Sequence, residues 1–352
     1  MTTVLLRAEH TAAIVEVRTD AGLVGIGETY AGAFVPHTVP PLVDRFAALL
    51  TGRSIDADDP AAELRRLRRE TAFWASAGLG AGVLAGVEAA LWDLCGKALQ
   101  LPVYRLLGGP QHDRLPVLVT GGVARQPAGE LLRAIERHLD RGFAGVRLGV
   151  DEDDDLAALL AQLRDRLGPG PELAFDCHME LRPPDRRWDV AAAADVLAAA
   201  APYRPLYVEE PLVYDDPAAY AALRNASDVL VAGGERLASH AEFAPWLRAG
   251  AFGVAQPDAS WAGLTDLLAV AAGGVPIAPH SWSAGVGTLQ NIHAGFACAS
   301  TLALELPPSP GPLHTELWGD AVTVRDGRLL PPEAPGWGAR LTDDVKDWFA
   351  LR

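Results

Sequence analysis

Residues 205–235 read PLYVEEPLVYDDPAAYAALRNASDVLVAGGE. A short apolar run at 205–210 is followed by a helical segment near 216–224 and by a second apolar run at 229–234. This order predicts a strand, a helix and a parallel strand, because two parallel strands need a crossover connection between them. The first run carries Glu209 near its end, and Glu235 directly follows the second.

The same unit repeats along the chain. Further apolar runs occur at 115–120, 143–148, 172–177, 252–256, 275–279 and 302–306. Helical segments alternate with them near 127–141, 154–167, 189–201, 240–248, 262–272 and 285–299. Right-handed βαβ units spaced about 22–35 residues apart close into a barrel when eight strands are present. We therefore expect an α/β fold with a (β/α)7β TIM-type barrel, in preference to a doubly wound open sheet.

The two ends of the chain follow a different pattern. Residues 14–19 alternate with period two, 20–22 form a turn, 23–28 form a second strand, and helical stretches follow at 40–50, 59–74 and 81–99. This predicts an N-terminal α+β capping domain over 1–112, ahead of a barrel over 113–317. The segment 321–329 predicts a hairpin with an Asp-Gly turn. A closed barrel has no free edge, so we expect the tail 318–352 to return to the cap.

Composition restricts the partners. The chain has 352 residues, with 30 Lys and Arg against 45 Asp and Glu, for a net charge of −15. Such an acidic protein is not expected to bind nucleic acid or an anionic membrane, because phosphates need a basic surface. The three cysteines form no CxxC pair, which suits reduced thiols. No signal peptide or membrane span stands out, so we expect a soluble, cytoplasmic protein.

Ionisable residues stand at the carboxyl ends of seven of the eight predicted strands. In a barrel of this kind chemistry takes place at that end. The residues are Arg147, Asp176, His178, Glu209, Glu210, Glu235, Asp258, His280 and Glu305. A solvated surface does not explain why they recur at one end of apolar strands.

Three of these residues predict a metal site. Asp176, Glu209 and Glu235 end three adjacent strands, and three carboxylates stay ionised together only around a cation. Hard oxygen ligands of this kind favour Mg²⁺, with Mn²⁺ as the second choice. Any one of them alone is explained equally well as a helix cap or a loop carboxylate. Their common register favours the metal.

Several short motifs occur in a fixed order along the whole chain. They are Gly25-Ile26-Gly27-Glu28, residues 87–97, residues 101–109, Phe175-Asp176, Val208-Glu209-Glu210-Pro211, Gly233-Gly234-Glu235, Gln256-Pro257-Asp258 and Pro279-His280. In this order they resemble the enolase superfamily, in the mandelate racemase/muconate lactonizing enzyme branch. The resemblance implies a capped (β/α)7β barrel and assigns Asp176, Glu209 and Glu235 as Mg²⁺ ligands. Its Glu-x-Pro pattern selects Glu209 over Glu210.

The resemblance also implies a general base. Asp258 and His280 match the Asp-His dyad of the branch, in which the carboxylate orients the imidazole and raises its basicity. Many members carry Lys-x-Lys on strand two, whereas this chain has Arg147-Leu148-Gly149. Arginine is a poor base but a good partner for a carboxylate. Racemisation between a lysine and a histidine is therefore not favoured, and Arg147 is a candidate substrate-binding residue.

Strand three supplies another acid–base group. Asp176-Cys177-His178 resembles the motif of sugar-acid dehydratases, which implies that His178 protonates a departing hydroxyl. Glu305 is expected near the substrate carboxylate, and Glu28 is a substrate-binding candidate in the cap. Tyr30, Phe34 and Trp74, which also lie in the cap, are candidates for substrate selectivity.

Together these features predict an enzyme, a Mg²⁺-dependent dehydratase of a sugar acid, either an aldonate or an aldarate. Removal of the proton alpha to the carboxylate is expected to form a metal-stabilised enediolate, and the product is a 2-keto-3-deoxy acid. A racemase, an epimerase or a lactone cycloisomerase is the alternative, because one scaffold supports several such reactions. A metal-binding protein without turnover is a third reading, but it has no use for a base. The expected partners are a small carboxylate substrate and further copies of the same chain.

Overall fold

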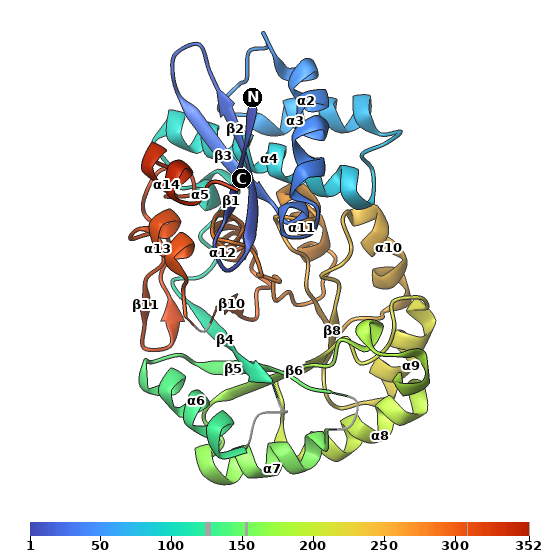
Figure 1. Ribbon diagram of the computed structural model, residues 1–352. Helices are drawn as coiled ribbons and strands as arrows, with labels where there is room; N and C mark the ends of the chain where they lie inside the picture. Colours follow the sequence, from blue (N-terminus) through green and yellow to red (C-terminus); the bar gives the residue numbers. More distant parts are fainter. Residues whose placement is uncertain (124–127, 152–153, 308, 352) are drawn as a thin grey trace.

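The computed structural model describes residues 1–123, 128–151, 154–307 and 309–351. Figure 1 shows a small sheet with helices, built from the N-terminal residues, above a larger region in which strands and helices alternate. The N- and C-termini both lie beside the small sheet (Figure 1).

The N-terminal part is an antiparallel sheet covered by helices. The sheet has the order β1 (Thr2–Arg7), β2 (Thr11–Arg18), β3 (Val24–Thr29). The two predicted strands of the hairpin are confirmed as β2 and β3, and β1 is an additional strand on the edge. The helices that follow are α1 (Ala31–Phe34), α2 (Val39–Leu50), α3 (Pro60–Thr71), α4 (Gly78–Leu99) and α5 (Val103–Leu106).

Helix α4 lies so close to β3 that two strand positions admit only glycine. A Cβ atom on Gly25 would overlap the carbonyl oxygen of Ala90, and one on Gly27 would overlap that of Gly86. Within the described residues α4 is the one helix with the length and apolar composition of a membrane span, yet 83% of its most apolar window is buried. That burial is typical of a core helix.

The larger region alternates parallel strands and helices. The strands β4 (Leu115–Val123), β5 (Gly145–Gly149), β6 (Glu172–Asp176), β7 (Tyr207–Glu209), β8 (Val231–Gly233) and β9 (Val254–Ala255) are neighbours in that order, and β10 (Leu304–Leu306) pairs with β4. The helices are α6 (Ala128–Asp140), α7 (Leu156–Leu167), α8 (Val190–Ala200), α9 (Pro217–Ala226), α10 (His240–Ala249), α11 (Leu264–Ala271) and α12 (Val286–Ala297). Each predicted helix is present, although residue 127, where the first was expected to begin, lies outside the described residues.

The predicted strand at 275–279 is reduced to isolated pairings. Ile277 forms single parallel bridges with Ala255 and with Thr301. Pro276 and Pro279 flank this residue and lack the N–H donors that a longer ladder would need. A small buried cluster connects these strands through Leu118, Ala174, Tyr207, Ala232, Val254, Ala278 and Ala303.

Acidic and hydroxyl side chains begin most of the surrounding helices. Asp155, Asp189, Asp216 and Ser239 precede α7, α8, α9 and α10, and each accepts a hydrogen bond from a backbone N–H of the first turn. Such caps satisfy donors that the helix itself leaves unpaired. Part of the acidic excess is therefore used in starting helices. Four short 3₁₀ helices complete the connections: Pro36–Thr38, Met179–Leu181, Pro184–Arg186 and Ala201–Tyr203.

The C-terminal tail contacts both regions. After α13 (Pro312–Trp318), the predicted hairpin forms from β11 (Val324–Arg325) and β12 (Arg328–Leu329), with positive φ at Asp326 and Gly327. It lies on the barrel side rather than on the cap, because β12 pairs with the beginning of β4. Beyond it, residues that include α14 (Asp343–Trp348) reach the N-terminal sheet, where Ala350 bridges Leu6.

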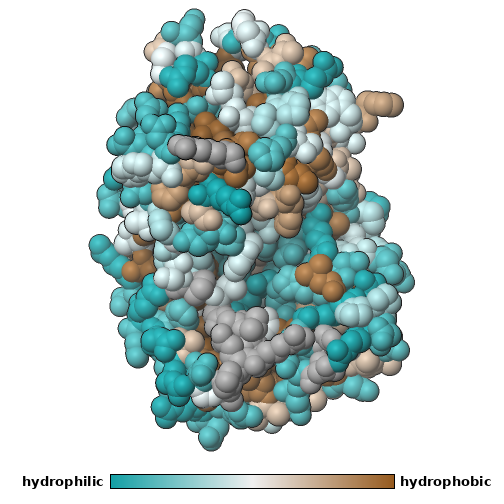
Figure 2. Space-filling model, viewed as in Figure 1, coloured by the Kyte–Doolittle hydropathy of each residue, from teal (hydrophilic) through white to brown (hydrophobic). Residues whose placement is uncertain are grey.

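The exposed apolar residues gather on the N-terminal part. In Figure 2 hydrophobic side chains lie mainly on the upper half of the face shown, which Figure 1 places over the small sheet and its helices. The large exposed side chains of this part are Phe34, Val35, Phe73, Trp74 and Leu101. The three cysteines are buried and free, as expected for reduced thiols.

Candidate active site

The carboxyl ends of the parallel strands bring most of the predicted site residues together. They are Arg147 in β5, Asp176 in β6, Glu209 in β7, Glu235 after β8, Asp258 after β9, His280 after Ile277, and Glu305 in β10. The β6–β7 register places Asp176 directly beside Glu209. An unbroken series of ion pairs then runs from Glu305 through Arg147 and both histidines to Asp258.

His280 and Asp258 form the predicted pair. His280 Nδ1 lies 2.9 Å from Asp258 Oδ2, and His280 Nε2 lies 3.4 Å from Glu235 Oε2. Burial alone lowers the pKa of His280, but Glu235 and Asp258 outweigh it and raise the pKa to about 10. Hydrogen bonds from Ser260 and Asn291 hold the other oxygen of Asp258. Asp258 therefore orients the imidazole of His280, and Ser260 and Asn291 hold Asp258 in place.

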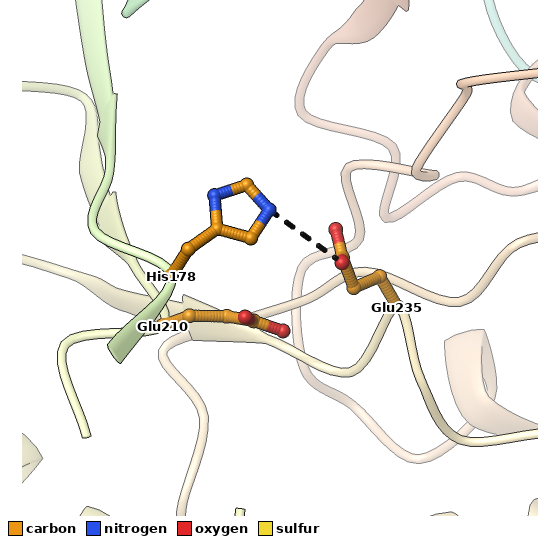
Figure 3. A group of neighbouring side chains, drawn as sticks. All are labelled: His178, Glu210 and Glu235. Carbon is orange, nitrogen blue, oxygen red and sulfur yellow. Dashed lines mark ion pairs between the residues drawn. The ribbon is translucent and has the colours of Figure 1, made fainter. Parts of the chain in front are cut away.

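His178, which follows the end of β6, also approaches the carboxylate of Glu235. Its Nδ1 lies 2.7 Å from Asp176 Oδ2 and its Nε2 lies 3.9 Å from Glu235 Oε1, as Figure 3 shows for the second pair. The backbone at His178 has φ +45°, which turns the chain sharply after β6. Burial lowers the pKa of His178, and Asp176 and Glu235 raise it to about 9. The ring is 32% exposed, so it is the more accessible of the two histidines.

Two carboxylate oxygens of the predicted metal site have no hydrogen-bond partner among the described residues. Asp176 Oδ1 and Glu235 Oε2 are both buried and accept no hydrogen bond, although Glu235 Oε2 lies 3.4 Å from His280 Nε2 in the ion pair above. A buried carboxylate oxygen without a hydrogen bond is costly in the absence of a cation, so both fit a divalent metal. Among the described residues, the group whose ligand atoms all lie within 4.8 Å of one another is His178, Glu210 and Glu235, which shares only Glu235 with the predicted set (Figure 3).

Glu209 and Glu210 differ in their partners. Both oxygens of Glu209 accept hydrogen bonds from Arg147, at 2.6 to 2.8 Å. Glu210 instead receives a bidentate pair from Arg236, at 3.0 and 3.1 Å, while its carboxylate stays near His178 and Glu235 (Figure 3). Glu210 follows the end of β7 and has φ +46°, so the alternation of a strand does not separate the two side chains, and each carboxylate has its own arginine. The choice of Glu209 as ligand stays a prediction.

Arg147 supplies a buried positive charge to Asp176, Glu209 and Glu305. Its guanidinium contacts Asp176 at 2.5 Å, Glu209 at 2.6 Å and Glu305 at 3.3 Å, and the side chain is 7% exposed. Burial disfavours the charged form, but the three carboxylates outweigh it and hold the pKa of Arg147 well above its ordinary value. Glu305 also accepts hydrogen bonds from Thr120 and from the N–H of Ser281. A fixed charge of this kind suits carboxylate binding.

Glu28 lies on the cap and faces the start of α12. Its two carboxylate oxygens accept hydrogen bonds from the backbone N–H groups of Ala284 and Gly287. Burial raises the pKa of Glu28 to about 7, against the lowering effect of these amides. The prediction that Glu28 binds substrate stays a prediction.

The aromatic residues of the cap divide into two groups. The Tyr30 ring lies 5.5 Å from the His280 ring, and Phe34 packs edge-on against Tyr30 at 5.1 Å. Trp74 instead packs against Phe46. Tyr30 is thus the selectivity candidate that the structure brings to the pair of His280 and Asp258.

Three supporting residues were not predicted from the sequence. Ser260 and Asn291 hold Asp258, and Arg236 holds Glu210. The sequence held a signal for Asn291, because helix α12 is mostly apolar but carries buried Thr288, Gln290, Asn291 and His293. Buried polar residues in such a helix indicate specific partners.

Known proteins match this chain across both regions. Residues 1–108 match the mandelate racemase/muconate lactonizing enzyme N-terminal domain, and residues 130–345 match the enolase C-terminal domain-like family. A D-galactonate dehydratase of Verminephrobacter eiseniae is 30% identical, with 94% of this chain and 91% of that protein aligned. An L-rhamnonate dehydratase of Saccharopolyspora erythraea is 31% identical, over 95% and 84%.

A solved structure shares the architecture. It is an L-talarate dehydratase from Polaromonas, complexed with Mg and L-glucarate, with a TM-score of 0.85 and 27% identity. The match covers 100% of this chain and 98% of the other. The two family matches and this structural similarity indicate an N-terminal cap and a C-terminal TIM-type barrel, and all three relatives are named dehydratases. The chain is therefore an enzyme that belongs to the mandelate racemase/muconate lactonizing enzyme family of the enolase superfamily.

Proposed function

We propose that the protein is a Mg²⁺-dependent dehydratase that converts a sugar acid, an aldonate or an aldarate, into a 2-keto-3-deoxy acid. The observation that carries the proposal is the pair of histidines around Glu235. Their Nε2 atoms approach the two oxygens of Glu235, at 3.4 Å for His280 and 3.9 Å for His178. Their Nδ1 atoms each contact a separate aspartate. The sugar-acid dehydratases among the relatives support the same reaction.

Dehydration needs two proton transfers, and two imidazoles provide them. One histidine takes the proton alpha to the substrate carboxylate, and the other gives a proton to the departing β-hydroxyl. His280, held by Asp258, is the better-positioned base because its ring is buried and fixed at Nδ1. His178 is more exposed, which suits a group that meets the hydroxyl-bearing chain of the substrate.

Asp176, Glu209 and Glu235 would hold the metal. When bound, Mg²⁺ supplies positive charge that fixes the substrate carboxylate, stabilises the enediolate and offsets the carboxylates that raise the pKa of both histidines. Arg147 and Glu305 lie next to this group and would bind the substrate carboxylate.

The strand pairings support a finer description of the fold. The position of β10 beside β4 and the two bridges of Ile277 are those that a (β/α)7β barrel requires. We place this barrel at 113–317, between a cap at 1–112 and a tail at 318–352.

The alternative is a racemase, an epimerase or a cycloisomerase. Two histidines around one site can also remove and return the α-proton from opposite sides without loss of a hydroxyl. The absence of a lysine at residue 149 excludes only the lysine–histidine form of such a reaction.

One experiment separates these reactions. The protein is incubated with Mg²⁺ and a library of sugar acids in D₂O, and 2-keto acid and α-deuterium are measured together. Formation of keto acid supports dehydration. Deuterium uptake with inversion and without keto acid would show epimerisation and contradict dehydration. No keto acid and no deuterium uptake with any sugar acid would contradict both reactions.

A further inference from the structure

The carboxylate of Glu28 ties the cap to the loop that follows His280. Glu28 lies in β3 and is 2% exposed. Its Oε1 accepts the N–H of Ala284 at 2.9 Å, and its Oε2 accepts the N–H of Gly287 at 2.8 Å. These donors lie at the start of α12, where free N–H groups and the helix dipole favour an acceptor with negative charge.

The backbone of Glu28 makes a second tie to the same helix. Its N–H donates to Gln290 Oε1 at 2.7 Å, and Gln290 Nε2 donates to the Glu28 carbonyl at 3.2 Å. One cap residue therefore fixes one position just before α12, Ala284, and two positions within its first two turns, Gly287 and Gln290.

The same two turns of α12 hold the catalytic dyad. Asn291 Nδ2 donates to Asp258 Oδ1 at 2.9 Å, and Asn291 Oδ1 accepts the N–H of Ala259 at 2.8 Å. Thr288 accepts a hydrogen bond from Ser281, the residue after His280. The contacts from the cap at 284, 287 and 290 thus interleave with those to the dyad at 288 and 291.

We propose that Glu28 is a positioning residue that acts through α12. By fixing residues 284–291, it holds Asp258 and His280 in the orientation that proton transfer needs, so that docking of the cap and alignment of the base are coupled. This inference rests on the proposed function. A small displacement of a base lowers the rate of proton transfer strongly while leaving binding nearly unchanged.

The first test is Glu28→Gln, which keeps the shape and presents an NH₂ group where one carboxylate oxygen stood. One of the two backbone N–H groups then loses its acceptor. We expect kcat to fall about 10- to 100-fold, with KM and the Mg²⁺ dissociation constant from calorimetry changed by less than about twofold. A primary isotope effect from α-deuterated substrate should increase, because proton abstraction becomes limiting.

Asp93→Asn is the matched control. Asp93 is also a fully buried carboxylate of the cap, and it also accepts two backbone N–H groups, those of Ile26 and Trp337. It does not contact the His280 loop within the described residues. Assayed at equal intervals below their own melting temperatures, D93N should keep kcat within about twofold of the wild type. Equal losses of kcat in both variants would overturn the proposal, and a rise in KM of E28Q at constant kcat would make Glu28 a substrate-binding residue instead.

A readout without turnover separates this proposal from the proposed function. A proton on His280 Nδ1, hydrogen-bonded to Asp258 at 2.9 Å, should give a low-field NMR signal that shifts or broadens in E28Q and stays in place in D93N. Gln290→Leu removes the backbone tie and should act in the same direction if E28Q does not fold. An unchanged signal in both E28Q and Q290L would overturn the positioning role, whereas a wild type that dehydrates no sugar acid would overturn only the proposed function.

Discussion

At the scale of the residue, Glu235 lies between two imidazoles that each have an aspartate behind them. His280 contacts Asp258, and His178 contacts Asp176. The two side chains differ in burial, since that of His280 is 6% exposed and that of His178 is 32% exposed. This asymmetry is the basis for assigning different proton transfers to them.

Replacement of each histidine by asparagine tests that assignment. His280→Asn should lower both keto acid formation and α-deuterium exchange on the order of 10²- to 10⁴-fold, the usual contribution of a general base. His178→Asn should lower dehydration similarly but retain exchange, because the α-proton is still removed. The reverse pattern would make His178 the base, and full activity of H280N would contradict the assigned dyad.

Arg147 leads to a prediction about stability. Arg147→Met leaves Asp176, Glu209 and Glu305 without their shared cation, and breaking a buried ion pair costs about 3–5 kcal/mol. We expect urea unfolding in EDTA to show a loss of that size, with partial recovery when Mg²⁺ is added. Arg340→Met removes an exposed pair with Asp320 and should change the free energy of unfolding by less than about 1 kcal/mol. Unaltered stability of R147M would contradict the counter-ion role.

At the scale of the element, contact between β3 and α4 determines the stability of the cap. In Gly27→Ala the new Cβ atom would overlap backbone atoms of α4, the carbonyl oxygen of Gly86 first. No flexible side chain lies at this contact that could move aside. Overpacking of this kind costs typically about 1–3 kcal/mol, and we expect the upper part of that range or more because the obstruction is backbone. Gly170→Ala, in open space, should leave the melting temperature unchanged. Equal melting temperatures for G27A and G170A would contradict this packing.

The elements themselves were largely predictable from periodicity. Apolar strands and amphipathic helices have different periods, so their alternation from 115 to 306 gave the order of the barrel elements and placed Asp176, Glu209 and Glu235 at neighbouring strand ends. The length of the strand predicted at 275–279 was overestimated. The run is apolar, but Pro276 and Pro279 lack the N–H groups that a longer hydrogen-bonded ladder needs.

Side-chain partners between distant elements were less predictable. The contacts of Glu28 were not predicted: its carboxylate meets two amides that are 256 and 259 residues away in the chain. The hairpin at 321–329 was expected on the cap, yet it pairs with β4. Such contacts depend on how helices and loops pack in three dimensions, and neither periodicity nor spacing encodes that packing.

At the scale of the whole molecule, His293 joins the cap, the barrel and the tail. It lies in α12, its Nδ1 accepts the N–H of Tyr104 at 3.1 Å, and its Nε2 lies 3.3 Å from the carbonyl oxygen of Trp337. The amide of Tyr104 can only donate, so Nδ1 must carry no proton, and Nε2–H donates to Trp337. The junction therefore requires a neutral histidine.

This requirement predicts how stability depends on pH. Burial lowers the pKa of His293 to about 3, whereas an unfolded histidine titrates near 6.5. The contribution of His293 is complete above pH 6.5 and decreases as pH falls, because the unfolded chain binds a proton that the folded protein does not; the slope is about 1.4 kcal/mol per pH unit. The free energy of unfolding, measured with urea at constant Mg²⁺ between pH 7.5 and about 4.5, should therefore fall more steeply for the wild type than for His293→Gln. All other titrating groups are shared by the two proteins and cancel in the difference. Parallel curves for H293Q and the wild type would mean that His293 is already charged in the folded protein, and the neutral junction would be wrong.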